Sequence, residues 1–133
     1  MKFIVITLII SSYVYAEDEF VAEKLKKCAQ ENGVSHEDYE KMRTFVVVEN
    51  DKAIKTMVCL YKNIGFMDPK GKLQQSGVIK IHVEKLSMSK KEADQLATKC
   101  IKEGQADSAE QAALLFWKCN LKEIKHMNKK PHS

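Results

Sequence analysis

The chain has 133 residues, enough for one domain around a single hydrophobic core. Hydrophobic residues make up 44% and charged residues 30% of it, a globular composition that excludes an intrinsically disordered chain. The net charge of +4 is small and scattered, which excludes a dedicated nucleic-acid binder.

The first sixteen residues have the pattern of a secretory signal peptide. Lys2 supplies a short positive region, residues 3–10 are almost entirely apolar, and the small residue Ala16 precedes an acidic segment. No later apolar run is long enough to cross a bilayer, so no membrane span is predicted. Removal of residues 1–16 from the 133 leaves a mature domain of 117, residues 17–133, which we expect to be secreted and extracellular.

Three helices are predicted in the first half of the mature chain from apolar residues at helical spacing. The first lies in 17–31. The second follows a capping box that begins at Ser35, and it includes Phe45 and Val46 at helical spacing. The third spans 51–64 and is apolar on several faces, which is typical of a helix at the centre of a bundle.

Two more helices are predicted towards the C-terminus. A capping box begins at Ser89, and the apolar stripe behind it ends before Gly104. The last helix begins near Ser108 and carries the largest aromatic cluster, with Phe116 and Trp117. Five helices are therefore predicted from local patterns alone.

The segment around residues 79–83 carries a different pattern. Ile79, Ile81 and Val83 alternate with polar residues, and this period of two locally predicts a β-strand. A single strand would have no partner in an otherwise helical chain. We therefore expect tertiary context to override the local preference.

Four cysteines, Cys28, Cys59, Cys100 and Cys119, predict two disulfides in a small secreted domain. No two of them have C-x-x-C spacing, which excludes a zinc ribbon and a thioredoxin-like motif. Four cysteines allow three connectivities, and their spacing alone does not choose among them.

The sequence contains none of the common catalytic or nucleotide-binding motifs. The four histidines are far apart, and none lies three or four residues from another histidine or a cysteine. We therefore predict no catalytic residues, no metal site and no cofactor.

The cysteine spacing and its surroundings resemble the insect odorant-binding protein family, in its four-cysteine or minus-C subgroup. The family's third cysteine is followed by an apolar run and a turn containing glycine, as in residues 59–71 here, and its sixth follows an aromatic helix, as in 115–119. Cys28 resembles the family's first cysteine and Cys100 its fourth. Lys55 and Glu110 stand where the two absent cysteines would pair.

This resemblance implies an all-α fold of six helices, linked by disulfides and enclosing an apolar cavity. It implies the pairings Cys28–Cys59 and Cys100–Cys119, and a fourth helix over 74–83. It also implies a carrier that solubilises small hydrophobic ligands such as odorants or pheromones. Because Lys55 and Glu110 have opposite charges, we hypothesise an ion pair in place of the third disulfide.

The expected partner is a small apolar ligand, volatile or lipid-like, with no nucleic acid; a membrane receptor or a second copy of the chain stays open. The residues expected to contact the ligand are apolar or aromatic and lie on the predicted helices or just beyond them. They are Phe45, Met57, Leu60, Tyr61, Ile64, Val78, Ile81, Leu96, Phe116 and Trp117.

Two other classes of function fit the same features. A secreted helical signalling or interaction protein would have the same signal peptide, helices and disulfides, but a filled core in place of a cavity. A secreted hydrolase fits less well, because no nucleophile–base pair is visible in the sequence.

Overall fold

The computed structural model describes residues 19–129, and the predicted signal peptide, residues 1–16, lies outside this range. The described part forms six α-helices: α2 Glu19–Glu31, α3 His36–Arg43, α4 Asp51–Ile64, α5 Gln75–Glu84, α6 Lys90–Glu103 and α7 Ala109–Lys129. Between residues 19 and 129, the only β structure is an isolated antiparallel bridge between Met67 and Leu73. The predicted all-α fold of six helices is therefore confirmed.

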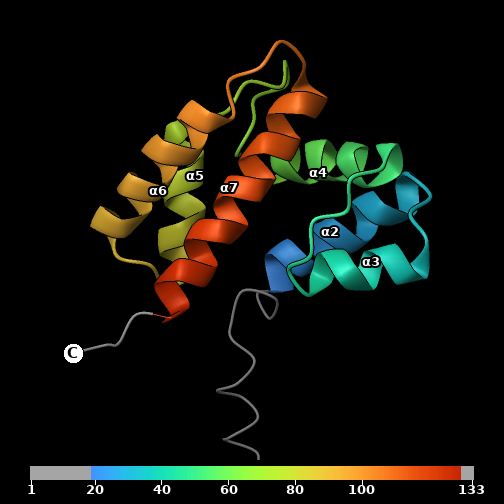
Figure 1. Cartoon of the computed structure of the whole chain (residues 1–133), viewed down its shortest axis with the longest axis horizontal. Coiled ribbons are helices and arrows are strands. Elements are labelled where there is room, and N and C mark those ends of the chain that lie inside the picture. The colour runs from blue at the N-terminus through green and yellow to red at the C-terminus, as the bar shows by residue number, and fades with distance from the viewer. Residues whose placement is uncertain (1–18, 130–133) are drawn as a thin grey trace, which may run out of the picture.

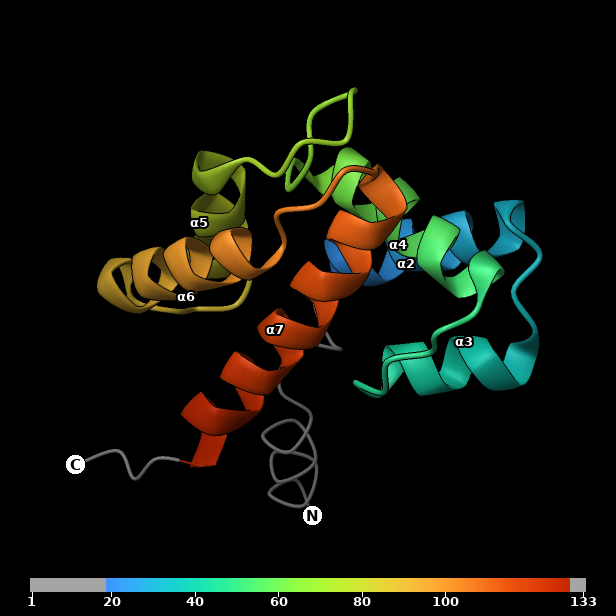
Figure 2. The same ribbon diagram turned by 45° about the horizontal axis from the view of Figure 1, so that its top comes forward.

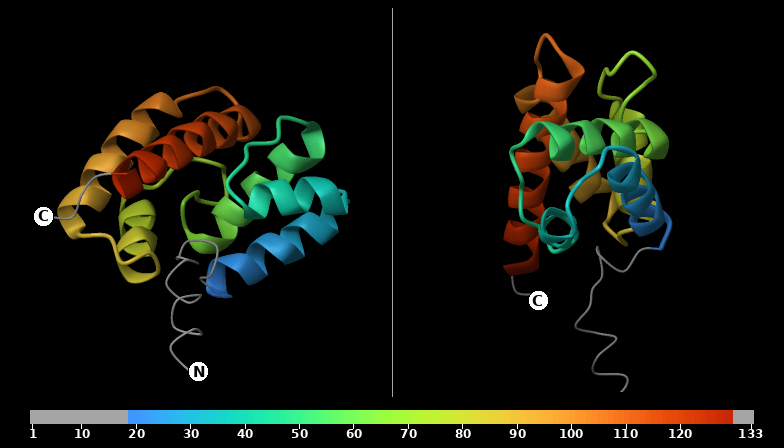
Figure 3. Two further views of the ribbon diagram at one scale, coloured as in Figure 1. Left: turned by 60° about the horizontal axis from the view of Figure 1, so that its bottom comes forward. Right: turned by 90° about the vertical axis from the view of Figure 1, so that its right-hand side faces the viewer.

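The long helix α7 runs between two groups of helices (Figure 1). Helices α5 and α6 lie on one side of it, and α2, α3 and α4 lie on the other, as the turned view in Figure 2 also shows. Helix α7 packs against both α4 and α6, while α2 packs against α4 and α5 against α6. Helix α3 has the least packing of the six and lies along α2 (Figure 3).

The two disulfides follow this division into groups. Cys28–Cys59 joins α2 to α4, and Cys100–Cys119 joins α6 to α7. These are the two pairings that the family resemblance implied, and they leave no free cysteine. Neither disulfide crosses from α4 to α7, so the contact between these two helices, which we call the joint, has no covalent link.

Local capping explains where several helices begin and end. Ser89 and Glu92 form a complete capping box at the start of α6, and Ser35 accepts a hydrogen bond from the backbone of Asp38 at the start of α3. Helix α4 ends at Gly65, whose φ of 89° is a left-handed conformation that favours glycine. The helix bounds predicted at these caps are confirmed.

Helix α5 replaces the strand that the alternation around residues 79–83 predicted locally. Val78, Ile81 and His82 are its buried residues, and their spacing of three and four places them on one helical face. The alternation predicted the wrong element because it requires His82, as a polar residue, to face solvent. The side chain of His82 is in fact fully buried. The helix that the resemblance implied over 74–83 is the correct one.

Helix α3 is shorter than its apolar pattern predicted. It ends at Arg43, so Phe45 and Val46 lie beyond it, although both were expected on the helix. The hydroxyl of Thr44 donates to the carbonyl of Glu40 at 2.8 Å, and the chain then turns away from the helix axis.

An aromatic cluster fills the centre of the molecule. The ring of Tyr61 stacks on Phe66 and meets Phe116 edge-on, with centroids 5.3 and 5.4 Å apart. Phe66 also stacks on His82, at 5.4 Å between ring centroids. The region where α4, α5 and α7 approach each other is therefore occupied by side chains that pack on one another.

Candidate ligand-binding site

A small apolar cavity lies between α2, α3, α4 and α7. Its volume is about 40 Å³, and its lining residues come from both sides of the joint. They are Val21, Ala22, Leu25, Met42, Arg43, Phe45, Met57, Leu60, Trp117 and Leu121. Nine of these ten are apolar, so the cavity favours an apolar occupant.

Helical spacing brings most of these side chains to one place. Val21 and Leu25 are four residues apart on α2, and Trp117 and Leu121 are four apart on α7, so each pair shares a helical face. Met57 and Leu60 come from α4, with a spacing of three. The cavity therefore depends on the positions of α2 and α7 relative to α4.

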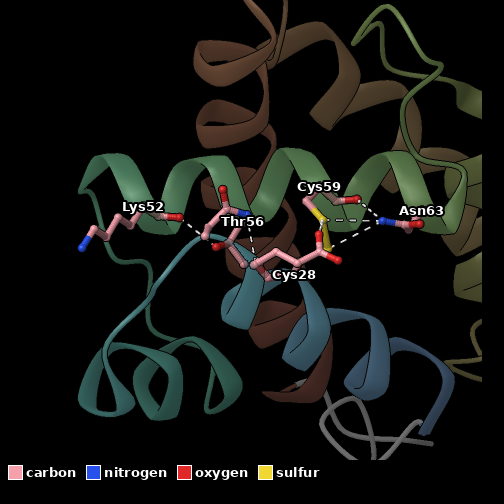
Figure 4. The surroundings of a disulfide bond; sticks show 7 residues. Cys28, Lys52, Thr56, Cys59 and Asn63 are labelled. Atoms are coloured by element: carbon pink, nitrogen blue, oxygen red, sulfur yellow. Dashed lines mark hydrogen bonds between the residues drawn. A yellow bond between two sulfur atoms is a disulfide. The ribbon is translucent and has the colours of Figure 1, made fainter.

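The disulfide Cys28–Cys59 fixes one wall of the cavity by tying α2 to α4 (Figure 4). The side-chain amide of Asn63 donates to the carbonyl of Cys59 at 2.8 Å and lies 3.6 Å from both sulfur atoms. The hydroxyl of Thr56, buried in the same helix, donates to the carbonyl of Lys52 at 2.8 Å. The wall from α2 and α4 is thus covalently held, while the opposite wall from α7 is held by packing.

The backbone at the end of α3 brings Phe45 into the cavity wall. The amide of Val46 donates to the carbonyl of Lys41 at 2.9 Å, and that of Phe45 donates to Met42 at 3.3 Å, a Schellman motif. Phe45 occupies the position usually taken by glycine, with φ at 70°. A left-handed conformation costs a residue with a side chain about 1–2 kcal/mol. This strained residue lies at the cavity.

One ion pair lies at the cavity. Arg43 lines the cavity, and its Nη2 atom lies 2.9 Å from Oε1 of Glu40, one turn earlier on α3. The hydrogen bond from Arg43 lowers the pKa of Glu40 below its ordinary value of 4.5. Arg43 is the only charged residue among the cavity-lining residues of the described chain.

Four of the ten residues predicted to contact ligand line this cavity, namely Phe45, Met57, Leu60 and Trp117. The other six are in the core but do not line it; they are Tyr61, Ile64, Val78, Ile81, Leu96 and Phe116. Ligand contact by any of the ten stays a prediction.

Sequence reasoning did not select six of the lining residues: Val21, Ala22, Leu25, Met42, Arg43 and Leu121. Val21, Leu25 and Met42 lie at helical spacing within the first two predicted helices, but periodicity does not distinguish a face that lines a cavity from one that fills the core. Arg43 gave no such signal.

The described residues also bear on metal sites and membrane spans. No group of three or more His, Cys, Asp or Glu residues between positions 19 and 129 is arranged to hold a metal ion. Over the same residues, no helix is both long enough and apolar enough to cross a membrane.

Comparison with known proteins identifies the family. The model of the PBP/GOBP family matches residues 11–123. Among solved structures, the chain is similar to odorant-binding protein dmelOBP28a from Drosophila melanogaster, at 22% identity and a TM-score of 0.68, covering 81% of this chain and 92% of that one. It is also similar to fatty acid binding protein OBP56a from the oral disk of the blowfly Phormia regina, at 17% identity and a TM-score of 0.60, covering 86% and 97%.

The comparison with curated proteins found no match. The two structural likenesses show the same fold, and the four cysteines form two disulfides, as in the four-cysteine subgroup that the sequence resembles. Because the family model matches most of its length, the chain belongs to the PBP/GOBP family.

Proposed function

We propose that this protein is a secreted, extracellular carrier that binds small hydrophobic molecules, such as odorants or lipid-like compounds, in the cavity between α2, α3, α4 and α7. The observation that carries the proposal is the apolar lining of this cavity, with Trp117, Met42 and Met57 among its residues. Family membership and the titles of the two similar structures, an odorant-binding and a fatty acid binding protein, support the same role.

Burial of apolar surface supplies enough free energy for such a role. Each buried methylene contributes about 0.8 kcal/mol, and the cost of association is subtracted from the sum. For a chain of about twelve carbons, roughly 10 kcal/mol of burial less an association cost of at least about 4 kcal/mol leaves about 6 kcal/mol, an affinity on the order of 0.1 mM from apolar contact alone. No catalytic group is needed for this function, and we propose a carrier that is not an enzyme.

The cavity must expand to accept such a ligand. At about 40 Å³ it is smaller than a cavity that takes benzene, which is roughly 150 Å³. Met42 and Met57 have unbranched, adaptable side chains that change rotamer at little cost. The wall from α7 has no disulfide to α4, so it can move away from α2 and α4. Both features favour a site that adapts to several ligands.

The competing proposal is a secreted helical signalling or interaction protein with a filled core. In the centre of the molecule, the rings of Tyr61, Phe66 and Phe116 do pack on one another and fill the core. The apolar cavity beside this cluster favours the carrier, because it gives an apolar ligand a starting space that a completely filled core lacks.

Uptake of a neutral apolar dye, N-phenyl-1-naphthylamine, by the mature protein tests the proposal. We expect stoichiometric binding, competition by long-chain or aromatic volatiles, and a change in the fluorescence of Trp117, which lines the cavity and is the only tryptophan of the chain.

Substitution Ala22→Phe should fill the cavity and abolish uptake of the dye, while the matched substitution Ala106→Phe, at an exposed loop position, should leave uptake unchanged. A folded protein that takes up no dye would overturn the proposal. Unchanged affinity in Ala22→Phe would show that the dye binds elsewhere.

A further inference from the structure

The C-terminal half of α7 concentrates the positive charge of the chain. Residues 118–130 contain five lysines and one glutamate, so their net charge of +4 equals that of all 133 residues. The rest of the chain is therefore balanced between acidic and basic side chains, which are spread along it. A local excess of this size attracts anions from solution.

Three lysines of this segment share one exposed face of the helix. Lys118, Lys122 and Lys125 follow each other at spacings of four and three residues, which aligns them along one side, and all three are exposed. Asn120 and Ile124 are buried on the opposite side. Figure 2 shows this half of α7 extending away from α2, α3 and α4. The lysine side of the helix is therefore open to solvent.

Helix α6 adds a fourth lysine to this side. A groove between α6 and α7 is lined by Lys99, Lys122, Glu123, Lys125 and His126. Nζ of Lys99 lies 2.7 Å from Oε2 of Glu123, whose side chain is only 17% exposed. The acidic residue of the groove is therefore largely covered and already paired, so it does little to neutralise the lysines of α7.

The remaining charges of the face are available to an external anion. Nζ of Lys118 lies 3.0 Å from Oε2 of Glu49, but both side chains are about half-exposed, and ion pairs of this kind are weak because water competes for them. Within residues 19–129, neither Lys122 nor Lys125 forms an ion pair. We call Lys99, Lys118, Lys122 and Lys125 the basic face.

The character of the basic face favours a long polyanion over a lipid surface. Among the described residues, the exposed large hydrophobic side chains are Phe20 and Val46, and neither belongs to α6 or α7. The face therefore offers no apolar anchor for a bilayer. Anionic lipids are concentrated in the cytoplasmic leaflet, which a secreted protein does not meet. Lysines act as point charges without the bidentate geometry of arginine, so they suit a row of repeated anionic groups.

We propose that the basic face docks the protein on an extracellular sulfated polysaccharide, whose sulfate groups lie along α7 and across the groove to α6. The inference rests on the secreted location in the proposed function and adds a second site to the carrier. None of the four lysines lines the apolar cavity, so both sites can be occupied at once. The polysaccharide would hold the carrier at a surface while its cavity continues to exchange ligand.

Fluorescence anisotropy of a labelled heparin hexasaccharide, titrated with the mature protein at neutral pH, tests the inference. We expect binding whose affinity falls about tenfold or more between about 50 and 200 mM NaCl, because each lysine that neutralises a sulfate releases a counterion. A hyaluronan hexasaccharide carries carboxylates but no sulfates. Its lower charge density should weaken binding by about fivefold or more.

Two matched double variants locate the site. Lys122→Gln with Lys125→Gln should lose about tenfold or more in affinity for the heparin hexasaccharide, and its affinity should depend less steeply on salt. Lys26→Gln with Lys27→Gln removes the same charge from exposed positions on α2 and should change the affinity less than about twofold. Both variants should take up N-phenyl-1-naphthylamine as the wild type does.

The outcomes separate the inference from the proposed carrier function. If both double variants lose affinity equally, binding follows net charge alone and the basic face is not a site. If the folded wild type binds no heparin hexasaccharide, or binds phosphatidylserine vesicles in its place, the inference is wrong while uptake of the dye still supports the carrier. If the wild type binds the hexasaccharide but takes up no dye, the docking site stands and the carrier function fails.

Discussion

The side chains of His82 and Asn120 form a buried link between α5 and α7. Nε2 of His82 lies 3.0 Å from Oδ1 of Asn120, and Nδ1 of His82 lies 2.7 Å from the carbonyl of Val78. Because a carbonyl only accepts, Nδ1 carries the proton in the neutral ring, and Nε2 is then an acceptor. Both nitrogens of the neutral ring are paired when the side-chain amide NH₂ of Asn120 faces Nε2.

Acidification should destabilise the fold through His82. Burial lowers the pKa of His82 below its ordinary value of 6.5, and the hydrogen bonds that its ring makes with the carbonyl of Val78 and the side chain of Asn120 only partly oppose this. The unfolded chain therefore binds more protons between the two pKa values. The contribution of neutral His82 to the free energy of unfolding is therefore complete above about pH 6.5. It falls as the pH drops towards the pKa of His82 in the folded protein, by at most about 1.4 kcal/mol per pH unit for this one proton.

Urea denaturation of the mature protein between pH 5 and 8 measures this effect. His82→Gln keeps a hydrogen-bonding side chain but does not titrate, so its stability should depend less steeply on pH. It should also be less stable than the wild type at pH 8, because it loses the ring that stacks on Phe66. Equal slopes for the two proteins would contradict the assignment to His82.

Gly77 is a second point where α5 depends on close packing. A methyl group at Gly77 would collide with the backbone carbonyl of Gly65, at the end of α4. At an exposed position inside a helix, alanine in place of glycine stabilises a protein by about 1 kcal/mol. Here we expect Gly77→Ala to be less stable than the wild type by about 2 kcal/mol or more, because a backbone atom cannot move aside as a side chain can.

Thermal or urea denaturation measures the effect of Gly77→Ala, with Ser76→Ala as the control. Ser76 is exposed on the same helix, so its replacement should leave stability unchanged or slightly raise it. A Gly77→Ala protein as stable as the wild type would show that α4 and α5 are not in such close contact.

At position 45, glycine should give a more stable protein than alanine, which is the reverse of the usual order. Both Phe45→Ala and Phe45→Gly remove the ring from the cavity wall, but only glycine relieves the left-handed backbone, where φ is 70°. The relief of about 1–2 kcal/mol exceeds the advantage of about 0.4–1 kcal/mol that alanine gains in the unfolded state. We therefore expect Phe45→Gly to be more stable than Phe45→Ala by about 0.5–1 kcal/mol.

The comparison of these two variants is internal, because the same ring is lost in both. Chemical denaturation supplies the stability difference, and dye uptake reports the effect on the cavity. If Phe45→Ala is the more stable of the two, the residue does not hold the left-handed conformation in solution.

Local signals explain which parts of the fold could be predicted. The capping box at Ser89 and the glycine at position 65 act on neighbouring residues alone, so they are readable in the sequence. Helix α5 was not readable in this way, because its buried face includes His82, whose partner Asn120 is 38 positions away. Only the family resemblance indicated the helix correctly.

The candidate site was predictable only in part, for a related reason. Burial of Tyr61 and Phe116 could be predicted, but each fills the space next to the other, so neither lines the cavity. Phe45 lines it through a backbone turn and not through a helical face. Arg43 lines it as a charged residue, which an apolar pattern omits.

The joint between α4 and α7 is held differently from our expectation. Lys55 and Glu110 were expected to form an ion pair across it, but no ion pair joins them in the described part of the chain, and both residues are exposed. Instead, Nζ of Lys118 on α7 lies 3.0 Å from Oε2 of Glu49, two residues before α4. Both partners are about half-exposed, so this pair contributes little to stability.

A disulfide at this joint should therefore change both stability and exchange of ligand. The family resemblance places the absent third bridge at Lys55 and Glu110, so we expect Lys55→Cys with Glu110→Cys to oxidise in the folded protein. The bridge would stabilise the protein by about 2–4 kcal/mol, because it restricts the unfolded chain. It would also tie α7 to the wall that Cys28–Cys59 already holds, so the dye should bind and dissociate more slowly.

Peptide mapping without reduction, urea denaturation and stopped-flow dye binding check the three parts of this prediction. The double variant Lys55→Ser with Glu110→Ser is the matched control, since it removes the same charges without a bridge and should exchange dye at the wild-type rate. If the new cysteines stay reduced, the two positions do not face each other and the correspondence with the family's bridge is wrong. If they join and the rates stay unchanged, ligand reaches the cavity without movement at the joint, and the end of α3 around Phe45 becomes the route to examine.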